Sequence, residues 1–296
     1  MSFTSDPQPF HRLYVGGGRS ATNAVVARDT LDAAVPVASH PAGKPGLPPA
    51  AWPAPGDPCW ELVTLTRDEL AALANSLDGH VVFPGLHGYQ DGRSATEVHF
   101  PTPRVIAVCM TKRDVATCLQ WITQHDWLLS IRSGGHNGAG FHLCNGLTLD
   151  LQNLDQMDYD VNCGEVTIGA GAKWKDIGAF LANKPGFLPG GTCGLVGAAG
   201  YTQGGGYSMV SRIFGLTCDL LVSAQVMLAD GSEVTASAKE NSDLFWALRG
   251  GGGGQFGVLL SMTFRLISPD QFFGFVLNWR LPDAAQALST SRNTTR

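Results

Sequence analysis

The feature that most constrains this sequence is the glycine-dense stretch from Ile131 to Tyr207. Two reactive side chains, His136 and Cys193, lie in it 57 residues apart, each within a glycine-rich loop. Glycine buries no side chain and costs backbone entropy, so this density needs another explanation. It lets bare backbone approach a large flat ligand and donate N–H groups to it. Either loop alone is explained as well by a tight turn with an ordinary His or Cys; the two together, in this order, favour a ligand site.

Composition indicates a globular chain and excludes several classes of partner. The 296 residues are 44% hydrophobic, enough for a sizeable core. The net charge of −5 and the lack of a basic run argue against nucleic acid. No apolar run reaches the roughly 18 residues that a membrane span needs. The first residues also lack the basic and apolar regions of a secretory signal, so we expect a cytoplasmic protein without a membrane partner.

The cysteines and histidines indicate no metal site. The seven cysteines are an odd, scattered set without a Cys-x-x-Cys pair, which is unlike a disulfide framework or a zinc site. No two histidines have the spacing of a metal pair on a helix. Cys193 differs from the other cysteines because the surrounding glycines leave its sulfur accessible.

The first part of the chain changes character near residue 59. Residues 1–58 contain ten of the seventeen prolines and are expected to be irregular. Residues 59–132 alternate helical and strand patterns, which predicts a small α/β subdomain with a βαβ unit. The expected elements are a helix Trp60–Leu77 with Thr66 as a candidate N-cap, strands Val81–Phe83 and Val105–Val108, a helix started by Thr111 with Asp114 in a partial capping box, and a strand Trp127–Arg132.

The second subdomain is predicted to span residues 133–267. Its expected elements are strands Leu147–Leu151 and Val166–Ala170 paired with each other, a helix with Trp174, Ile177 and Leu181 on one face, a hairpin of Leu220–Leu228 and Glu233–Ala236 turning at Asp230–Gly231, a helix capped by Ser242, and a strand Gly257–Leu266. Five glycines, residues 250–254, lie between the last two. They are read either as a flexible linker or, in preference, as a loop against the cofactor.

The two reactive loops resemble those of the berberine bridge enzyme-like FAD-linked oxidoreductases, in the vanillyl-alcohol-oxidase or PCMH superfamily. In that family an Arg-Ser/Gly-Gly-Gly-His loop bonds the flavin 8α-methyl, and a later Gly-x-Cys segment bonds flavin C6. His136 and Cys193 fall on these two positions. The similarity continues through Ser211–Leu216, Asp219, Leu228–Gly231, Asp243–Gly251 and Gly257–Val258, and covers roughly residues 80–266.

The resemblance implies an α+β fold: a PCMH-type FAD-binding domain made of a small α/β subdomain and a larger mixed or antiparallel sheet subdomain with helices. The cofactor is FAD, expected to be covalently linked through His136 and Cys193. The residues that it places at the cofactor are Arg132, Ser133, Gly134, Gly135, His136, Asn137, Gly138, Gly191, Thr192, Cys193, Val196, Gly197, Gly200, Tyr201, Gly204, Gly205, Gly206, Tyr207, Gly257 and Val258.

The resemblance also implies a reaction. Hydride would pass from a sugar, alcohol or secondary metabolite to flavin N5, and O2 would accept the electrons as hydrogen peroxide. Val196 matches the position that controls oxygen access, where valine is typical of oxidases; a packing role is the alternative. Tyr201 stands where many relatives have a histidine near the flavin N1–C2 edge. Tyrosine donates a hydrogen bond there but does not become a cation.

The largest departure from the family lies after Ile267. Relatives continue into a substrate domain that holds the catalytic base, whereas residues 268–296 contain only its start, with Phe272–Trp279 and a polar, patternless tail. No catalytic residue is therefore assigned. A truncated product, completion of the site by a second chain or a homodimer, and a reduced function all stay open. The rival functions are a non-catalytic FAD-binding protein and a reductase with noncovalent FAD.

Overall fold

The computed structural model describes residues 66–86, 88–89, 101–125, 127–268 and 280–294. The chain divides into two compact units, one of residues 1–39 and 268–296 and one of residues 40–267, which holds all of the predicted site. The predicted irregular segment 1–58 and the stretch Phe272–Trp279 lie outside the described residues.

In the unit of residues 1–39 and 268–296, the polar tail is not patternless. It contains η3 (Leu281–Asp283) and the helix α8 (Ala284–Thr294). The hydroxyls of Ser289 and Thr290 both donate to the carbonyl oxygen of Gln286, one turn back along this helix.

The first sheet has four strands in the order β1-β2-β4-β3: β1 (His80–Val82), β2 (Val105–Val108), β4 (Leu147–Asp150) and β3 (Leu129–Arg132). β4 is parallel to both β2 and β3, and β1 is antiparallel to β2. The expected pairing of Leu147–Leu151 with Val166–Ala170 is therefore wrong. Every residue of β4 is buried, as in the central strand of a parallel sheet, so β4 belongs with β2 and β3. The first sheet therefore includes a strand, β4, that lies beyond residue 132, where the first subdomain was predicted to end.

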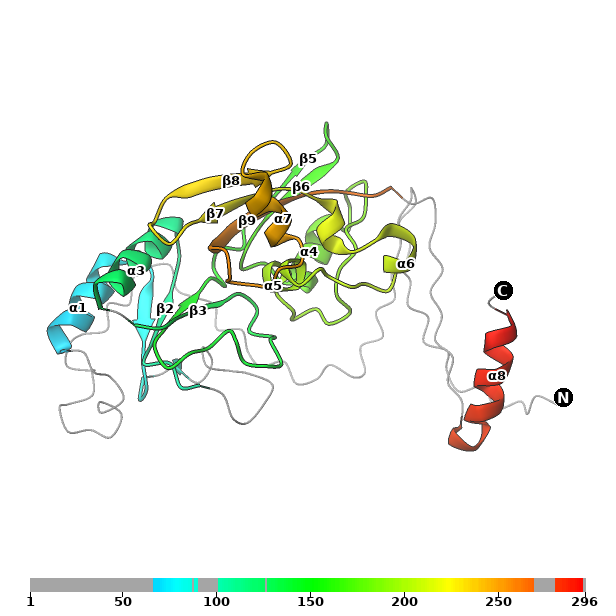
Figure 1. The fold of residues 1–296 in the computed structure, drawn as a ribbon, viewed down its shortest axis with the longest axis horizontal. Helices are drawn as coiled ribbons and strands as arrows, with labels where there is room; N and C mark the ends of the chain where they lie inside the picture. The colour runs from blue at the N-terminus through cyan, green and yellow to red at the C-terminus, as the bar shows by residue number, and fades with distance from the viewer. Residues whose placement is uncertain (1–65, 87, 90–100, 126, 269–279, 295–296) are drawn as a thin grey trace. The chain divides into compact units, whose positions relative to one another are not determined.

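Two helices lie side by side next to this sheet, α1 (Arg67–Ser76) and α3 (Lys112–His125) (Figure 1). The predicted N-cap Thr66 is confirmed, since its hydroxyl accepts from Glu69 N and the Glu69 carboxylate accepts from Thr66 N. The predicted capping box of Thr111 and Asp114 is confirmed in the same way.

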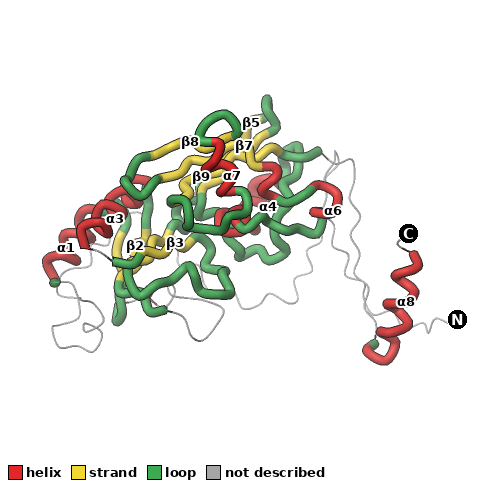
Figure 2. The backbone as a smooth tube through the Cα atoms, viewed as in Figure 1, coloured by secondary structure: helices red, strands yellow, loops and turns green. Residues whose placement is uncertain are grey.

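The second sheet is antiparallel, with five strands in the order β5-β6-β9-β7-β8. Its strands are β5 (Met157–Asp160), β6 (Glu165–Gly169), β9 (Val258–Arg265), β7 (Leu221–Met227) and β8 (Glu233–Ser237). Figure 2 draws the strands of both sheets in yellow. The predicted hairpin of β7 and β8 is confirmed, and Gly231 in its turn has φ +83°. β5 was not predicted.

Short helices occupy the connections of this sheet: α4 (Trp174–Leu181), α5 (Ala198–Gln203), α6 (Ser211–Phe214), η2 (Thr217–Leu220) and α7 (Ser242–Leu248). The predicted buried face of α4, Trp174, Ile177 and Leu181, is confirmed. The predicted cap of α7 is wrong by one residue, because Asn241 is the N-cap and Ser242 the first helical residue. Asn241 has φ +48°, a conformation that asparagine adopts more readily than most residues.

Buried side chains of both sheets join one hydrophobic cluster, which includes Leu147 and Leu149 of β4 and Ile168 and Phe264 of the second sheet. In the part of the chain that the structure describes, no helix combines the length and hydrophobicity needed to cross a bilayer.

The carboxylate of Asp114 fastens α3 to the turn between α1 and β1. It is fully buried and accepts hydrogen bonds from four backbone N–H groups. The donors are Asp78 at 2.6 Å, Gly79 at 3.1 Å, Met110 at 2.8 Å and Thr111 at 3.1 Å. One carboxylate therefore accepts backbone hydrogen bonds both at the start of α3 and in the turn between α1 and β1, so its removal affects both.

We predict that Asp114→Ala lowers the free energy of unfolding by at least ~3 kcal/mol, since several backbone donors lose their acceptor. Chemical denaturation monitored by circular dichroism measures this. Asp176→Ala is the matched control, because Asp176 is also in the first turn of a helix but is exposed. Equal small losses in both variants would contradict the anchoring role of Asp114.

Candidate functional site

The structure brings the two predicted reactive side chains together. His136 follows β3, and Cys193 lies in the segment between α4 and α5. His136 Nε2 and Cys193 Sγ are 3.8 Å apart, although the residues are 57 positions apart in the chain. Both side chains are exposed. Two nucleophiles are therefore presented to the same small region of the surface.

Backbone contact between the two loops makes this approach possible. A Cβ atom placed on Gly134 would lie 2.3 Å from Gly197 N, and one on Gly197 would lie 2.4 Å from both Gly134 N and Ser133 Oγ. No side chain larger than hydrogen fits at either glycine without moving the other loop. Ser133 adds a hydrogen bond from Oγ to the carbonyl oxygen of Ala170 at 2.6 Å.

A buried ion pair supports the His136 loop from below. Arg132 Nη1 lies 2.5 Å from Asp150 Oδ2, and these residues are paired in the register of β3 and β4. Burial raises the pKa of Asp150, and the positive charge of Arg132 opposes that rise. Gly135, at φ +68°, passes over the guanidinium so closely that a Cβ there would lie 2.9 Å from Arg132 Nε. The loop is thus seated on the ion pair.

The Asn137 side chain closes its own loop. Its Oδ1 accepts from Ala139 N at 2.9 Å and from Phe141 N at 3.4 Å. Asn137 and Gly138 are exposed beside His136. A Cβ on Gly138 would meet no atom within 4 Å, so the surface there is open.

Bonds to α4 hold the end of the Cys193 segment. Trp174 N donates to Val196 O at 3.1 Å, and Lys175 N donates to Gly194 O at 2.9 Å. Val196 N in turn donates to Cys193 O at 3.2 Å, which closes a turn at the cysteine. Val196 is half-buried and packs against the hydrophobic core, while Thr192 is exposed.

Aromatic rings support the start of the same segment. The Trp174 ring is buried beneath it, and a Cβ on Gly190 would lie 2.3 Å from Trp174 Cε3. Tyr201 of α5 meets Trp174 edge to face, with ring centroids 5.1 Å apart. Gly191 lies against both rings.

The phenol of Tyr201 is engaged within the protein. It donates to the carbonyl oxygen of Tyr207 at 2.5 Å, across the predicted glycines 204–206. Burial raises the pKa of Tyr201, so its hydroxyl stays protonated at neutral pH. Gly205 and Gly206 have φ +100° and +82°, which favours glycine at both.

The glycine run 250–254 lies against these elements. Gly252 N donates to Gln203 O at 2.9 Å, and a Cβ on Gly254 would lie 3.4 Å from Ile131 Cδ1 of β3. A Cβ on Gly253 would come 3.9 Å from Gly200 Cα. The contacts of Gly257 and Val258, in contrast, are with β7.

Three residues of this region were not predicted to belong to the site: Asp150, Trp174 as a support for the glycines, and Thr217, whose hydroxyl donates to Pro189 O at 2.7 Å. Arg132 and Asp150 carry opposite charges at the ends of two strands. These charges indicate an ion pair only when the two strands are known to pair with each other. The sequence held no comparable signal for Thr217.

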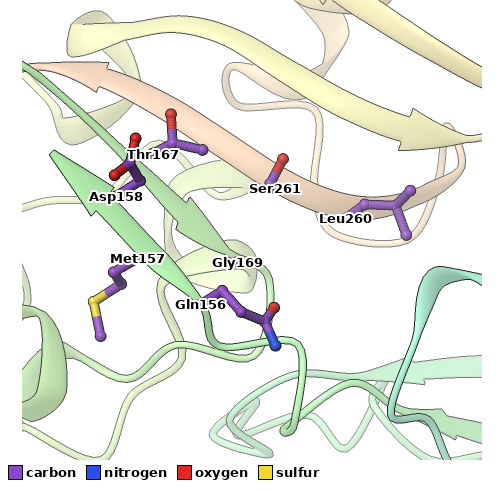
Figure 3. Close-up of a pocket in the computed structure, with 7 residues that line it drawn as sticks. All are labelled: Gln156, Met157, Asp158, Thr167, Gly169, Leu260 and Ser261. Atoms are coloured by element: carbon purple, nitrogen blue, oxygen red, sulfur yellow. The ribbon is translucent and has the colours of Figure 1, made fainter. Parts of the chain in front are cut away.

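A pocket of about 190 Å³ lies elsewhere, on β5, β6 and β9 (Figure 3). It is lined by Gln156, Met157, Asp158, Thr167, Gly169, Leu260 and Ser261. None of these is among the residues predicted to bind the cofactor. We place the candidate site at the exposed His136–Cys193 pair because the structure brings these two nucleophiles within 3.8 Å of each other.

We predict that Gly197→Ala forces the two loops apart and lowers the free energy of unfolding by ~2 kcal/mol, as overpacking does. Gly178→Ala in α4 is the control, because a Cβ there meets no atom within 4 Å; it is expected to gain up to ~1 kcal/mol. Denaturant unfolding compares them, and an unchanged Gly197→Ala would show that the loop contact is not tight.

Known proteins resemble this chain over the residues that form the site. Residues 103–237 match the family described as FAD binding domain. An uncharacterised FAD-linked oxidoreductase of Bacillus subtilis is 33% identical over 223 residues, which are 73% of this chain and 49% of that protein. Tetrahydroberberine oxidase of Berberis wilsoniae is 32% identical over 64% of this chain and 36% of its own length. The chain thus spans half or less of these relatives.

A solved structure shows the same fold. Glucooligosaccharide oxidase from Acremonium strictum superposes with a TM-score of 0.63 at 31% identity, over 68% of this chain and 43% of that one. That enzyme is described as carrying a 6-S-cysteinyl, 8α-N1-histidyl FAD. The predicted α+β, PCMH-type fold is confirmed. The chain therefore has an FAD-binding domain over residues 103–237 and resembles the FAD-linked oxidoreductases of the berberine bridge enzyme-like kind.

Proposed function

We propose that this domain binds FAD at the His136–Cys193 pair with a covalent link to each side chain. We propose further that the whole protein oxidises a sugar, an alcohol or a secondary metabolite, with O2 as acceptor and hydrogen peroxide as product. The observation that carries the proposal is the distance of 3.8 Å between His136 Nε2 and Cys193 Sγ.

The pair fits the chemistry of a doubly linked flavin. The two attachment points, the 8α-methyl group and C6, lie on the same ring of the flavin, so the side chains that reach them must be close neighbours. Both must also be exposed to the ligand, and both are. A neutral imidazole nitrogen and a thiolate are the nucleophiles that such links require.

The surrounding residues would hold the cofactor mainly through backbone. Gly134, Gly135 and Gly138 flank His136 without side chains, and the glycine run 250–254 lies beside α5. Such stretches offer N–H groups to a ligand that approaches closely. The buried ion pair of Arg132 and Asp150 keeps the His136 loop in place while it does so.

Bound FAD would supply the redox chemistry by accepting hydride from the substrate and passing electrons to O2. The protein would supply placement. The Tyr201 hydroxyl donates its hydrogen bond to Tyr207 O, so toward a ligand its oxygen acts as an acceptor rather than a donor. It is also uncharged at neutral pH, so we assign the stabilisation of negative charge to backbone N–H groups instead.

The relatives support the substrate class only broadly, since their names include a tetrahydroberberine oxidase and a glucooligosaccharide oxidase. Both are longer than this chain. The catalytic base and the substrate pocket belong, in this proposal, to a further segment of polypeptide, on the same chain or on a partner.

We predict that the purified protein is yellow and that the colour stays in the acid-precipitated pellet. Each of His136→Ala and Cys193→Ala should keep coloured pellets, because one link is left, and the double variant should lose the colour to the supernatant. Cys163→Ala is the matched control, because Cys163 is an exposed thiol in the turn between β5 and β6.

A white pellet from yellow protein would rule out the covalent links and favour the reductase with noncovalent FAD. Reduction of the flavin by a nicotinamide nucleotide would then test that alternative. A colourless protein would contradict FAD binding by this chain. Peroxide release with sugars, alcohols or alkaloids separates an oxidase from a protein that binds FAD without turnover.

A further inference from the structure

The two ends of the segment that carries Cys193 are held in different ways. At its C-terminal end, the carbonyl oxygens of Gly194 and Val196 accept hydrogen bonds from the first residues of α4, as described above. Ala198 N also donates to Ala172 O at 2.9 Å. These are backbone bonds, which any sequence could make. Its start is held at Pro189, whose carbonyl oxygen accepts a hydrogen bond from the side chain of Thr217 at 2.7 Å.

Thr217 bonds two separate segments of the site, at Pro189 and at Gly206. It is fully buried at the start of η2, 28 positions from Pro189 in the chain. Its backbone N–H donates to Gly206 O at 2.9 Å, and its hydroxyl also lies 3.1 Å from that oxygen. A hydroxyl has one proton, so the shorter contact, with Pro189, is its main hydrogen bond, and the N–H serves Gly206.

The packing around Thr217 is tight and continuous with the aromatic support of the segment. A Cβ on Gly206 would lie 2.7 Å from Thr217 Cβ and 2.8 Å from Tyr201 Cε1. Tyr201 meets Trp174, and Trp174 lies under Gly190. The buried side chains of Thr217 and Trp174, with the half-buried ring of Tyr201 between them, therefore form a row against residues 189–191. The rings fill space there, but only the hydroxyl of Thr217 specifies a direction for the Pro189 carbonyl.

We infer that Thr217 is a positioning residue for Cys193. Its bond to Pro189 fixes the path of Pro189–Cys193 so that the thiol lies beside His136. The inference rests on the proposed function, because the purpose of that placement is the link from Cys193 to FAD. Reactive groups need support of this kind, since a small misplacement of the segment would separate Sγ from its target.

Each link is an oxidation by two electrons. A C–H bond of the flavin and the S–H bond of Cys193, or an N–H bond of His136, are replaced by one C–S or C–N bond. Dioxygen takes the two electrons and two protons and becomes hydrogen peroxide. The share of protein with acid-stable flavin after a fixed time therefore reports the placement of each side chain separately, without any substrate turnover.

The test places Thr217→Val in two single-link backgrounds. In His136→Ala only Cys193 can form a link, and there Thr217→Val should slow the appearance of acid-stable flavin about fivefold, which corresponds to ~1 kcal/mol. In Cys193→Ala only His136 can link, and the same change should have little effect. Thr217→Ser keeps the hydroxyl and should restore the rate in the His136→Ala background. Thermal unfolding of each variant is measured alongside.

Equal slowing in both backgrounds would overturn the inference and make Thr217 a general structural residue. An unchanged rate in His136→Ala would also overturn it. If neither background gains acid-stable flavin even with Thr217 present, the covalent part of the proposed function fails. Positioning is then tested on protein freed of FAD, by the rate at which iodoacetamide alkylates Cys193, read by mass spectrometry.

In that second measurement, His136→Ala should change the alkylation rate of Cys193 when Thr217 is present, because the imidazole is the thiol's neighbour. The same change should have much less effect in Thr217→Val, where the two side chains are no longer held together. Equal effects of His136→Ala in both proteins would show that Thr217 does not set the distance, independently of the flavin.

Discussion

The close contact between the backbones of Gly134 and Gly197 is the constraint on which the site depends. Gly134 follows β3 of the first sheet, and Gly197 is the N-cap of α5, next to the antiparallel sheet. A methyl group on either would collide with the other's main chain. The two halves of the domain can meet there only because both positions lack side chains, and His136 and Cys193 meet as a consequence.

Different interactions then hold each loop at this contact. A buried ion pair supports the His136 loop, and a charge pair of this kind is valuable for its geometry more than for net stability. Aromatic packing and one hydroxyl support the Cys193 segment. The glycine-rich loops are therefore supported by buried side chains: Gly135 packs against Arg132, and Gly190 packs against Trp174.

Local patterns in the sequence predicted local structure well. Thr66 and Thr111 start their helices as capping residues, and the turn at Asp230–Gly231 joins the predicted hairpin. Each of these depends on residues a few positions apart. The partners of β4 were predicted wrongly, because a fully buried strand carries no mark of which strands lie beside it. The N-cap of α7 was predicted one residue too late, because the side chain of Asn241 donates to Thr235 O and makes no capping hydrogen bond of the kind that the sequence pattern indicates.

The same limit applies to the site. The resemblance singled out His136 and Cys193, and the structure places them side by side. The residues that support them, Asp150, Trp174 and Thr217, act through contacts between distant segments. Threonine or tryptophan alone is compatible with many roles, so their function was visible only in three dimensions.

The parallel pairing of β3 with β4 has a consequence for the loop that carries His136. Because neighbouring parallel strands run the same way, the chain must return the full length of the sheet between Arg132 and Leu147. Such a return needs about a dozen residues or more. The connection therefore has a minimum length set by the sheet, whatever its residues do for a ligand. A deletion within it would disturb strand pairing first, whereas insertions at the exposed positions after His136 would leave both strands in register.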